Sequence, residues 1–207
     1  MVPPPYRIES ERLVVRCWEP RDAPLLKDAI DTSLDHLRPW MPWAHDEPQT
    51  LDEKVDLLRG FRGRFDAGED FVYGIFSADE SEVLGGSGLH TRAGEGALEI
   101  GYWLRVGATG RGFATEMVAA LTRVAFAVCN VDRVEIRIDP ENEPSLRIPR
   151  RLGYVEEARL RRRLPARAPG GPRCDSLIFS MIEAEFEVSA AAETDIAAYD
   201  AAGRRLI

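Results

Sequence analysis

One stretch of sequence constrains the possible structure of this chain more than any other. Residues 101–116 read GYWLRVGATGRGFATE, in which a strand-like start leads to Gly107, Gly110 and Gly112. Apolar residues then recur at helical spacing over residues 113–128. A glycine loop between a strand and a helix presents unpaired backbone N–H groups, and the helix dipole favours negative charge there. The sequence therefore predicts an anion-binding loop, with an ordinary strand-to-helix turn as the alternative.

Two common phosphate-binding loops do not fit these glycines. A P-loop needs a lysine directly after its last glycine, whereas Phe113 follows Gly112 here. A dinucleotide-binding loop has the spacing G-x-G-x-x-G, whereas this loop has G-x-x-G-x-G. The loop therefore belongs to neither of these two classes.

The loop does resemble the signature of another family. Residues 109–114, TGRGFA, align with the pattern Q/R-x-x-G-x-G/A of the GCN5-related N-acetyltransferase (GNAT) family, with Thr109 in place of the usual Gln or Arg. The flanking segments LEIGYWL at 98–104 and GFATE at 112–116 resemble the RimJ/RimL-like branch, which includes ribosomal-protein N-terminal acetyltransferases. The resemblance extends over residues 8–186.

The resemblance and the strand and helix patterns together predict the fold class. We expect an α+β protein with a mixed, mostly antiparallel, splayed sheet of about seven strands and about four main helices. Residues 1–186 form the expected N-acetyltransferase domain, and residues 187–207 form a C-terminal extension of unknown role. Within this extension, both a terminal helix and a strand around residues 196–199 are compatible with the sequence.

The resemblance implies transfer of an acetyl group from acetyl-coenzyme A (acetyl-CoA) to a primary amine, on a protein N-terminus or a small molecule. The amine attacks the thioester directly, so no covalent nucleophile is needed. Longer acyl donors stay open. Two alternatives from other classes are a non-catalytic acyl-CoA sensor and a ribosome-associated binding protein.

The expected acetyl-CoA-binding residues follow from the glycine loop and the family's motifs. The backbone N–H groups of the loop would hold the phosphates, and the edge of the preceding strand would pair with the pantetheine amides. The resemblance places Asn142 on the pantetheine side. The expected residues are Trp103, Leu104, Arg105, Thr109, Gly110, Arg111, Gly112, Phe113, Ala114, Thr115, Asn142 and Ser145.

Two residues are expected to handle protons. An alkylammonium group must lose a proton before it attacks, and Glu99 alternates out of the strand that precedes the glycine loop. We therefore expect Glu99 to act as the base, although a carboxylate in this pattern is also compatible with a solvated face. Many family members carry a tyrosine general acid at the position of Pro149, and RimJ/RimL-like members often carry a serine instead. This assigns Ser145 to the departing sulfur.

The segment Leu37–Trp43, LRPWMPW, is the expected acceptor side of the cleft. Its two prolines prevent a regular helix, so its aromatic residues either fill the core or line a cleft. In the resembling family this region lies beside the acceptor. We therefore expect Trp40, Met41 and Trp43 to bind the substrate, with help from Arg92.

The length, net charge and cysteine and histidine content of the chain limit its other properties. A length of 207 residues suits one domain, and a net charge of −8 argues against nucleic acid as a partner. No apolar run approaches the length of a membrane span, and the start MVPPP is not a secretory signal. Three scattered cysteines and three scattered histidines give no disulfide or metal pattern, so we expect a cytoplasmic protein without a metal. The sequence leaves a homodimer open.

Residues 147–173 depart from the acidic average. They contain nine arginines and only two acidic residues, Glu156 and Glu157. A solvated face, a site for acidic substrates or the 3′-phosphate of coenzyme A, and contact with nucleic acid or a ribosome are the three interpretations. Because the whole chain has a net negative charge, contact with nucleic acid or a ribosome is the weakest of the three interpretations.

Overall fold

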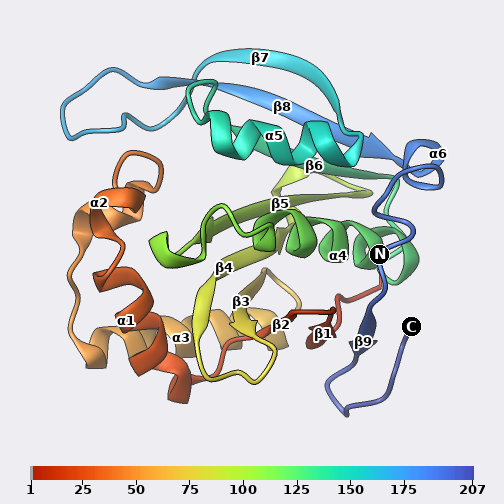
Figure 1. Cartoon of the computed structure of the whole chain (residues 1–207), viewed down its shortest axis with the longest axis horizontal. Helices are drawn as coiled ribbons and strands as arrows, with labels where there is room; N and C mark the ends of the chain where they lie inside the picture. The colour runs from red at the N-terminus through yellow and green to blue at the C-terminus, as the bar shows by residue number, and fades with distance from the viewer. Residues whose placement is uncertain (1) are drawn as a thin grey trace.

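The computed structural model describes residues 2–207 and contains one mixed sheet (Figure 1). The nine strands lie in the order β7-β8-β6-β5-β4-β3-β2-β1-β9. The strands are β1 Arg7–Glu9, β2 Leu13–Cys17, β3 Phe71–Ser77, β4 Val83–His90, β5 Ala97–Leu104, β6 Arg133–Ile138, β7 Val155–Leu164, β8 Cys174–Ile182 and β9 Ala197–Tyr199. The α-helices are α1 Ala23–Asp31, α2 Leu34–Leu37, α3 Leu51–Asp66, α4 Phe113–Ala127, α5 Glu143–Leu152 and α6 Glu183–Phe186. The four longest helices are α1, α3, α4 and α5, as the sequence predicted.

The sheet is splayed between β5 and β6, which are its one parallel pair. Residues 97–99 of β5 pair with residues 133–135 of β6, and beyond them the two strands separate. Residues 100–104 of β5 thus lack a neighbouring strand on that side, although they pair with β4 on the other. The predicted mixed, mostly antiparallel, splayed sheet is confirmed.

Alternating residues of the strands supply two cores on the two faces of the sheet. On β2, Leu13 and Val15 lie in the larger core, whereas Val14 lies in the smaller one. Apolar residues of α4 and α5 complete the larger core, and those of α1 complete the smaller core. Figure 1 shows α4 and α5 crossing the same face of the sheet.

Local capping signals set the ends of two long helices. At the start of α3, the Thr50 hydroxyl accepts the Glu53 N–H and the Glu53 carboxylate accepts the Thr50 N–H, which is a capping box. At the start of α5, Asn142 accepts the N–H of Ser145. The same helix ends at Gly153, whose φ of 86° is left-handed. All three signals were predicted from the sequence.

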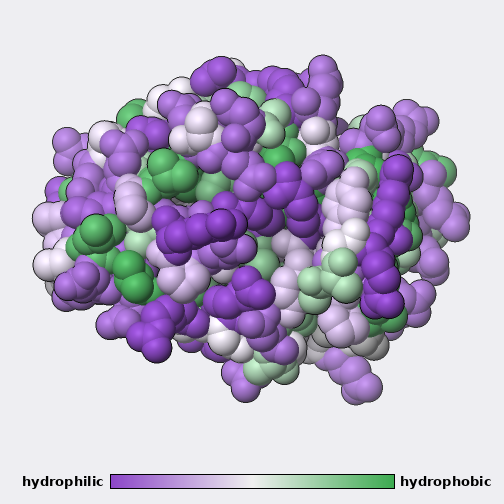
Figure 2. All heavy atoms as spheres, turned by 90° about the horizontal axis from the view of Figure 1, so that it is seen from below, coloured by the Kyte–Doolittle hydropathy of each residue, from purple (hydrophilic) through white to green (hydrophobic). Residues whose placement is uncertain are grey.

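The C-terminal segment packs on this chain as a strand. β9 pairs antiparallel with β1, and Ala191, Ile196 and Ala198 are buried in the larger core. The final residues fold back on β9, where Leu206 donates its N–H to the Ala198 carbonyl. This outer edge of the sheet is therefore covered. The face seen from below is mostly hydrophilic, with small separate hydrophobic areas (Figure 2).

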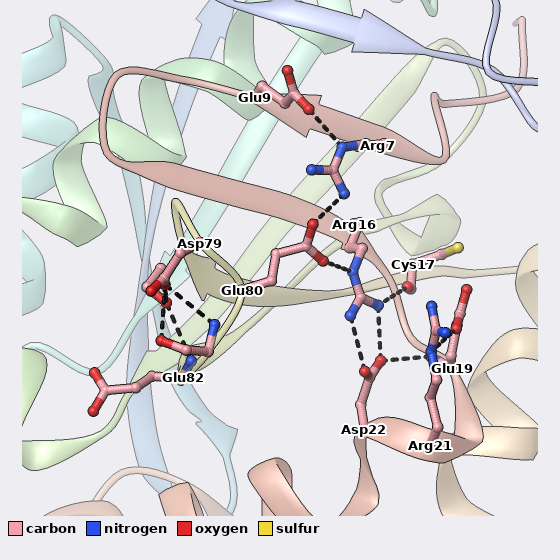
Figure 3. A network of polar contacts seen from close by, with 12 residues as sticks. Arg7, Glu9, Arg16, Cys17, Glu19, Arg21, Asp22, Asp79, Glu80 and Glu82 are labelled. Carbon is pink, nitrogen blue, oxygen red and sulfur yellow. Dashed lines mark hydrogen bonds and ion pairs between the residues drawn. The ribbon is translucent and has the colours of Figure 1, made fainter.

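A network of charged side chains fastens the β3–β4 turn to the rest of the chain (Figure 3). Arg16 donates to Glu80 in this turn at 2.5 Å and to both oxygens of Asp22, which precedes α1, at 2.8 and 2.9 Å. Arg7 pairs with Glu80 at 2.6 Å. The Arg16 guanidinium also lies 4.0 Å from the centroid of the Phe76 ring.

Within residues 2–207, no helix combines the length and apolar composition that crossing a membrane requires.

Candidate functional site

The glycine loop forms a cradle of free backbone N–H groups at the start of α4. Gly110 and Gly112 have φ values of 72° and 84°, which favour glycine over any residue with a Cβ. Within the described residues, the N–H groups of residues 110–115 donate to no backbone or side-chain acceptor. A Cβ built on Gly110 meets no atom within 4 Å, so the space beside it is open. This geometry suits the phosphates of a coenzyme A.

Thr109 turns away from the cradle. Its hydroxyl donates to the Val106 carbonyl at 2.8 Å, and its N–H donates to the same oxygen. Its side chain thus closes the short turn of residues 106–108 that precedes the cradle. The cradle itself is built from N–H groups and does not depend on this side chain.

The free edge of β5 continues from the cradle. The Arg105 N–H donates to the Leu84 carbonyl of β4, so Arg105 faces β4. In an antiparallel strand, the backbone N–H and C=O groups of successive residues point to opposite sides of the strand. The backbone groups of Tyr102 and Leu104 therefore point away from β4, to the side where β6 has separated from β5. Among the three expected residues of this edge, Leu104 therefore offers its backbone to a ligand. The Arg105 side chain pairs instead with Asp28 at 2.9 Å.

A cavity of about 140 Å³ lies where β5 and β6 separate. Its walls come from β5, β6, the start of α5, the loop after α2 and the loop after β7. Four of the expected residues line it, namely Trp40, Met41, Asn142 and Ser145. These residues come from segments more than a hundred positions apart in the chain.

Among the residues expected for acceptor binding and proton transfer, three lie outside the lining of this cavity. The Trp43 ring packs on Trp103 with their centroids 5.5 Å apart and joins the smaller core. Arg92 and Glu99 lie beside the cavity and bind each other, with Nη2 and Oε1 2.5 Å apart. The core interpretation therefore describes Trp43, and the cleft interpretation describes Trp40 and Met41.

Glu99 is buried within a cluster of charges. Only 4% of its surface is exposed, and its second oxygen lies 3.2 Å from Nε of Arg137, which lines the cavity. That oxygen, Oε2, makes no hydrogen bond, and within residues 2–207 it is the one buried side-chain oxygen or nitrogen in this state. Its neighbour in the β5–β6 register, Glu135, also pairs with Arg137. Two guanidinium groups thus pair with the Glu99 carboxylate, and Oε2 is its oxygen without a hydrogen bond.

Ser145 contributes a free hydroxyl to the cavity wall. Its Oγ makes no hydrogen bond within the described residues, whereas its N–H is capped by Asn142 and its carbonyl accepts from the Tyr102 phenol at 3.4 Å. Tyr102 also lines the cavity, and burial raises its pKa, so the phenol stays protonated at neutral pH. No motif or spacing in the sequence marked the Tyr102 side chain as part of the site.

Arg167 lies in the loop after β7 and links it to two other segments that line the cavity. These are the loop between β6 and α5 and the loop after α2. Arg167 binds Asp139 at 2.7 and 2.9 Å and also pairs with Glu141. Its guanidinium lies 5.6 Å from the centroid of the Trp40 ring, and its carbonyl lies 3.0 Å from Nε2 of His45. Burial would raise the pKa of Asp139, but the hydrogen bonds and charge of Arg167 outweigh it and lower that pKa. The arginine-rich stretch was the one sequence signal for this residue.

Five of the other eight arginines of residues 147–173 form two groups. Arg150 and Arg159 pair with Glu156 and Asp175. Residues 161–163 are exposed at an irregularity in β7, the uncovered edge strand of the sheet. Charges and bulges at an edge strand prevent pairing with other chains. This role favours the interpretation of these arginines as a solvated face.

Within residues 2–207, no group of three or more His, Cys, Asp or Glu side chains is arranged to hold a metal ion.

Comparison with known proteins agrees with this geometry. Residues 12–155 match the family described as "Acetyltransferase (GNAT) domain". The "Uncharacterized N-acetyltransferase p20" of Bacillus licheniformis is 30% identical over 184 residues, which are 86% of this chain and 96% of that protein. The "[Ribosomal protein uS5]-alanine N-acetyltransferase" of Escherichia coli (strain K12) is 28% identical over 159 residues, covering 74% and 80%. A solved structure of Mycobacterium smegmatis RimJ with CoA-disulfide has a TM-score of 0.74 and 26% identity, and covers 90% of each chain.

Proposed function

The chain belongs to the GNAT family of acetyltransferases, and we propose that it acetylates the amino group of a protein N-terminus. We take acetyl-CoA as the donor, because the matched family is one of acetyltransferases and a similar protein, Mycobacterium smegmatis RimJ, was solved with CoA-disulfide. A relative named as an alanine N-acetyltransferase of ribosomal protein uS5 supports a protein acceptor over a small amine. The proposal rests above all on one spatial sequence: an N–H cradle, the free edge of β5 and a cavity beside it.

These three parts match the parts of the donor in order. The free N–H groups of residues 110–115 bind the phosphates, and the Tyr102 and Leu104 backbone pairs with the amides of the pantetheine arm. The thioester then reaches the cavity, where Trp40 and Met41 form the acceptor side. When bound, acetyl-CoA supplies an acyl group that is already activated.

The chain's own residues have two proton tasks in this proposal. The ammonium group first loses one proton, which passes to water. Its nitrogen then forms a bond with the acetyl carbon while the carbon–sulfur bond breaks, so nitrogen gives up a second proton and sulfur takes up one. Glu99 takes the proton from nitrogen through a water, using the oxygen that makes no hydrogen bond. The free hydroxyl of Ser145 donates to the departing sulfur.

A thiol-release assay with a panel of amines tests the acceptor class. The purified protein would receive acetyl-CoA with peptides that have free or blocked N-termini, and separately with polyamines, aminoglycosides and amino acids. We expect thiol release with free N-termini and mass spectrometric evidence of acetylation at the terminal residue. Turnover with small amines alone would overturn the protein acceptor. Binding of coenzyme A without thiol release from any amine would favour the sensor alternative.

A further inference from the structure

Arg12, in the turn between β1 and β2, reaches the phosphate cradle. We infer that it is a positioning residue for binding of the donor's diphosphate, because it orients one peptide of the cradle and neutralises Glu116. This inference rests on the proposed donor site at residues 110–115 and assigns a new role within that site. It lies outside the glycine signature, ninety-eight positions before Gly110.

Arg12 holds the peptide that joins Arg111 to Gly112. Nη1 of Arg12 donates to the Arg111 carbonyl at 3.1 Å. In a trans peptide the carbonyl and the N–H point in opposite directions, so the Gly112 N–H points away from Arg12 and into the cradle. Arg12 also lies 4.8 Å from the centroid of the Phe113 ring, the first residue of α4. The guanidinium thus fixes the direction of a donor that the phosphates need.

Arg12 also binds the carboxylate of Glu116, in the first turn of α4. A carboxylate there stabilises the helix dipole, but it also repels an anion bound at the same helix end. Its oxygens receive hydrogen bonds from the Ser10 hydroxyl at 2.8 Å, from the Arg12 N–H at 2.9 Å and from Arg12 Nε at 2.7 Å. Nη2 of Arg12 lies 2.6 Å from the same carboxylate. The β1–β2 turn therefore cancels the one negative charge in the first turn of α4.

This arrangement predicts opposite effects for the two partners of one ion pair. Removing Arg12 leaves the Glu116 carboxylate uncompensated beside the phosphates, so donor binding weakens. Removing the charge of Glu116 leaves Arg12 with an unopposed positive charge, so donor binding tightens. A purely structural clamp gives the same sign for both changes, because both break the same contact.

Calorimetric titration with coenzyme A, together with melting temperatures, tests this inference. The variants are Arg12→Met, Arg12→Lys, Glu116→Gln and the double variant Arg12→Met with Glu116→Gln. Arg62→Met is the matched control, since Arg62 pairs with Asp66 at 2.9 Å and lies 5.6 Å from the centroid of the Tyr6 ring, away from the cradle. ADP serves as a second ligand that carries a diphosphate without the pantetheine arm.

We expect Arg12→Met to weaken coenzyme A binding about tenfold and Glu116→Gln to tighten it about twofold, although both lower the melting temperature. The double variant should recover most of the loss, Arg12→Lys should lie between Arg12→Met and the unmodified protein, and Arg62→Met should bind normally. ADP should show the same order.

Wild-type affinity in Arg12→Met would overturn the inference and leave the proposed function intact. Equal weakening by Arg12→Met, Glu116→Gln and the double variant, in proportion to lost stability, would reduce the pair to a structural clamp. Absence of coenzyme A binding to the unmodified protein would instead reject the donor site itself.

Discussion

Glu99 shows why the identity of a residue does not settle its role. The sequence places a carboxylate on the strand before the cradle, which suits a base. The structure adds Arg92 and Arg137, which pair with that carboxylate at 2.5 and 3.2 Å. Oε2 of the same group makes no hydrogen bond, and the proposed role as a base depends on this oxygen.

Replacing Glu99 by Gln should lower kcat by about a hundredfold, the lower end of the range for general-base catalysis, because the attacking nitrogen loses its proton acceptor. Glu135→Gln is the matched control, since Glu135 is its register neighbour and also binds Arg137. Steady-state kinetics over a range of pH would compare the two. Equal losses of kcat with unchanged pH profiles would show that Glu99 only positions Arg137.

Replacing Ser145 by Ala should lower kcat about tenfold, because the leaving sulfur loses one hydrogen-bond donor. The backbone N–H that Asn142 caps is unaffected by this change. Coenzyme A affinity by calorimetry should therefore stay within about twofold, since the phosphates bind elsewhere. A kcat equal to that of the unmodified enzyme would remove Ser145 from the proton path.

At the scale of elements, the loop after α2 combines two roles that its sequence left unresolved. Trp40 and Met41 line the cavity, whereas Trp43 turns back to Trp103 and the smaller core. The Arg167 guanidinium also lies over the Trp40 ring, 5.6 Å from its centroid, so the loop after β7 contacts the loop after α2. Residues three positions apart thus serve the site and the core.

Two substitutions in this loop should therefore fail in different ways. Trp40→Ala should raise the KM for the acceptor about tenfold and leave coenzyme A affinity unchanged, because it removes one wall of the acceptor cavity. Trp43→Ala should lower the free energy of unfolding by about 2 kcal/mol, since it leaves a gap beside Trp103. Kinetics and urea unfolding on both variants would separate them. A loss of stability in Trp40→Ala with normal KM would return that residue to the core.

The elements that the sequence predicted well are those with local signals. The capping box at Thr50 and the Asn142 and Gly153 boundaries of α5 depend on residues a few positions apart. β1 and β9 have only three residues each, and they pair with each other across nearly the whole chain. Their existence depends on that long-range pairing, so no local pattern could reveal β1.

The same distinction applies to the whole site. The N–H cradle is local, so its glycines and helix start were sufficient to predict it. The cavity combines segments from residue 38 to residue 167, and its Arg167–Asp139 pair was not predictable from spacing. These segments meet where β5 and β6 separate. That separation was expected only from the family resemblance, since sequence patterns do not define where paired strands separate.

The buried thiols predict how the stability of the whole molecule depends on pH. Burial raises the pKa of Cys17 to about 11 and that of Cys129 to about 12. Both thiols therefore keep their protons in the folded state at a pH where the unfolded chain has lost them. A raised folded-state pKa contributes stability below the unfolded value of about 8.5, and this contribution is lost as pH rises toward the folded value.

The free energy of unfolding should therefore fall between about pH 8.5 and about pH 10.5, with Cys17 contributing about 2 kcal/mol of the decrease. Urea unfolding at both pH values would measure it in the unmodified protein and in Cys17→Ala. The variant should show the smaller decrease, whatever its absolute stability. Equal decreases in both proteins would show that Cys17 ionises as readily in the folded state as in the unfolded chain.

Calorimetry with coenzyme A measures whether the N–H groups of residues 110–115 bind the donor's phosphates, as proposed. Gly110 and Gly203 have φ values of 72° and 74°, and a Cβ at either meets no atom within 4 Å. Gly110→Val and Gly203→Val thus carry the same backbone strain, but only the first places a side chain in the cradle. We expect at least about tenfold weaker coenzyme A binding for Gly110→Val and normal binding for Gly203→Val. Normal binding by a folded Gly110→Val protein would contradict it.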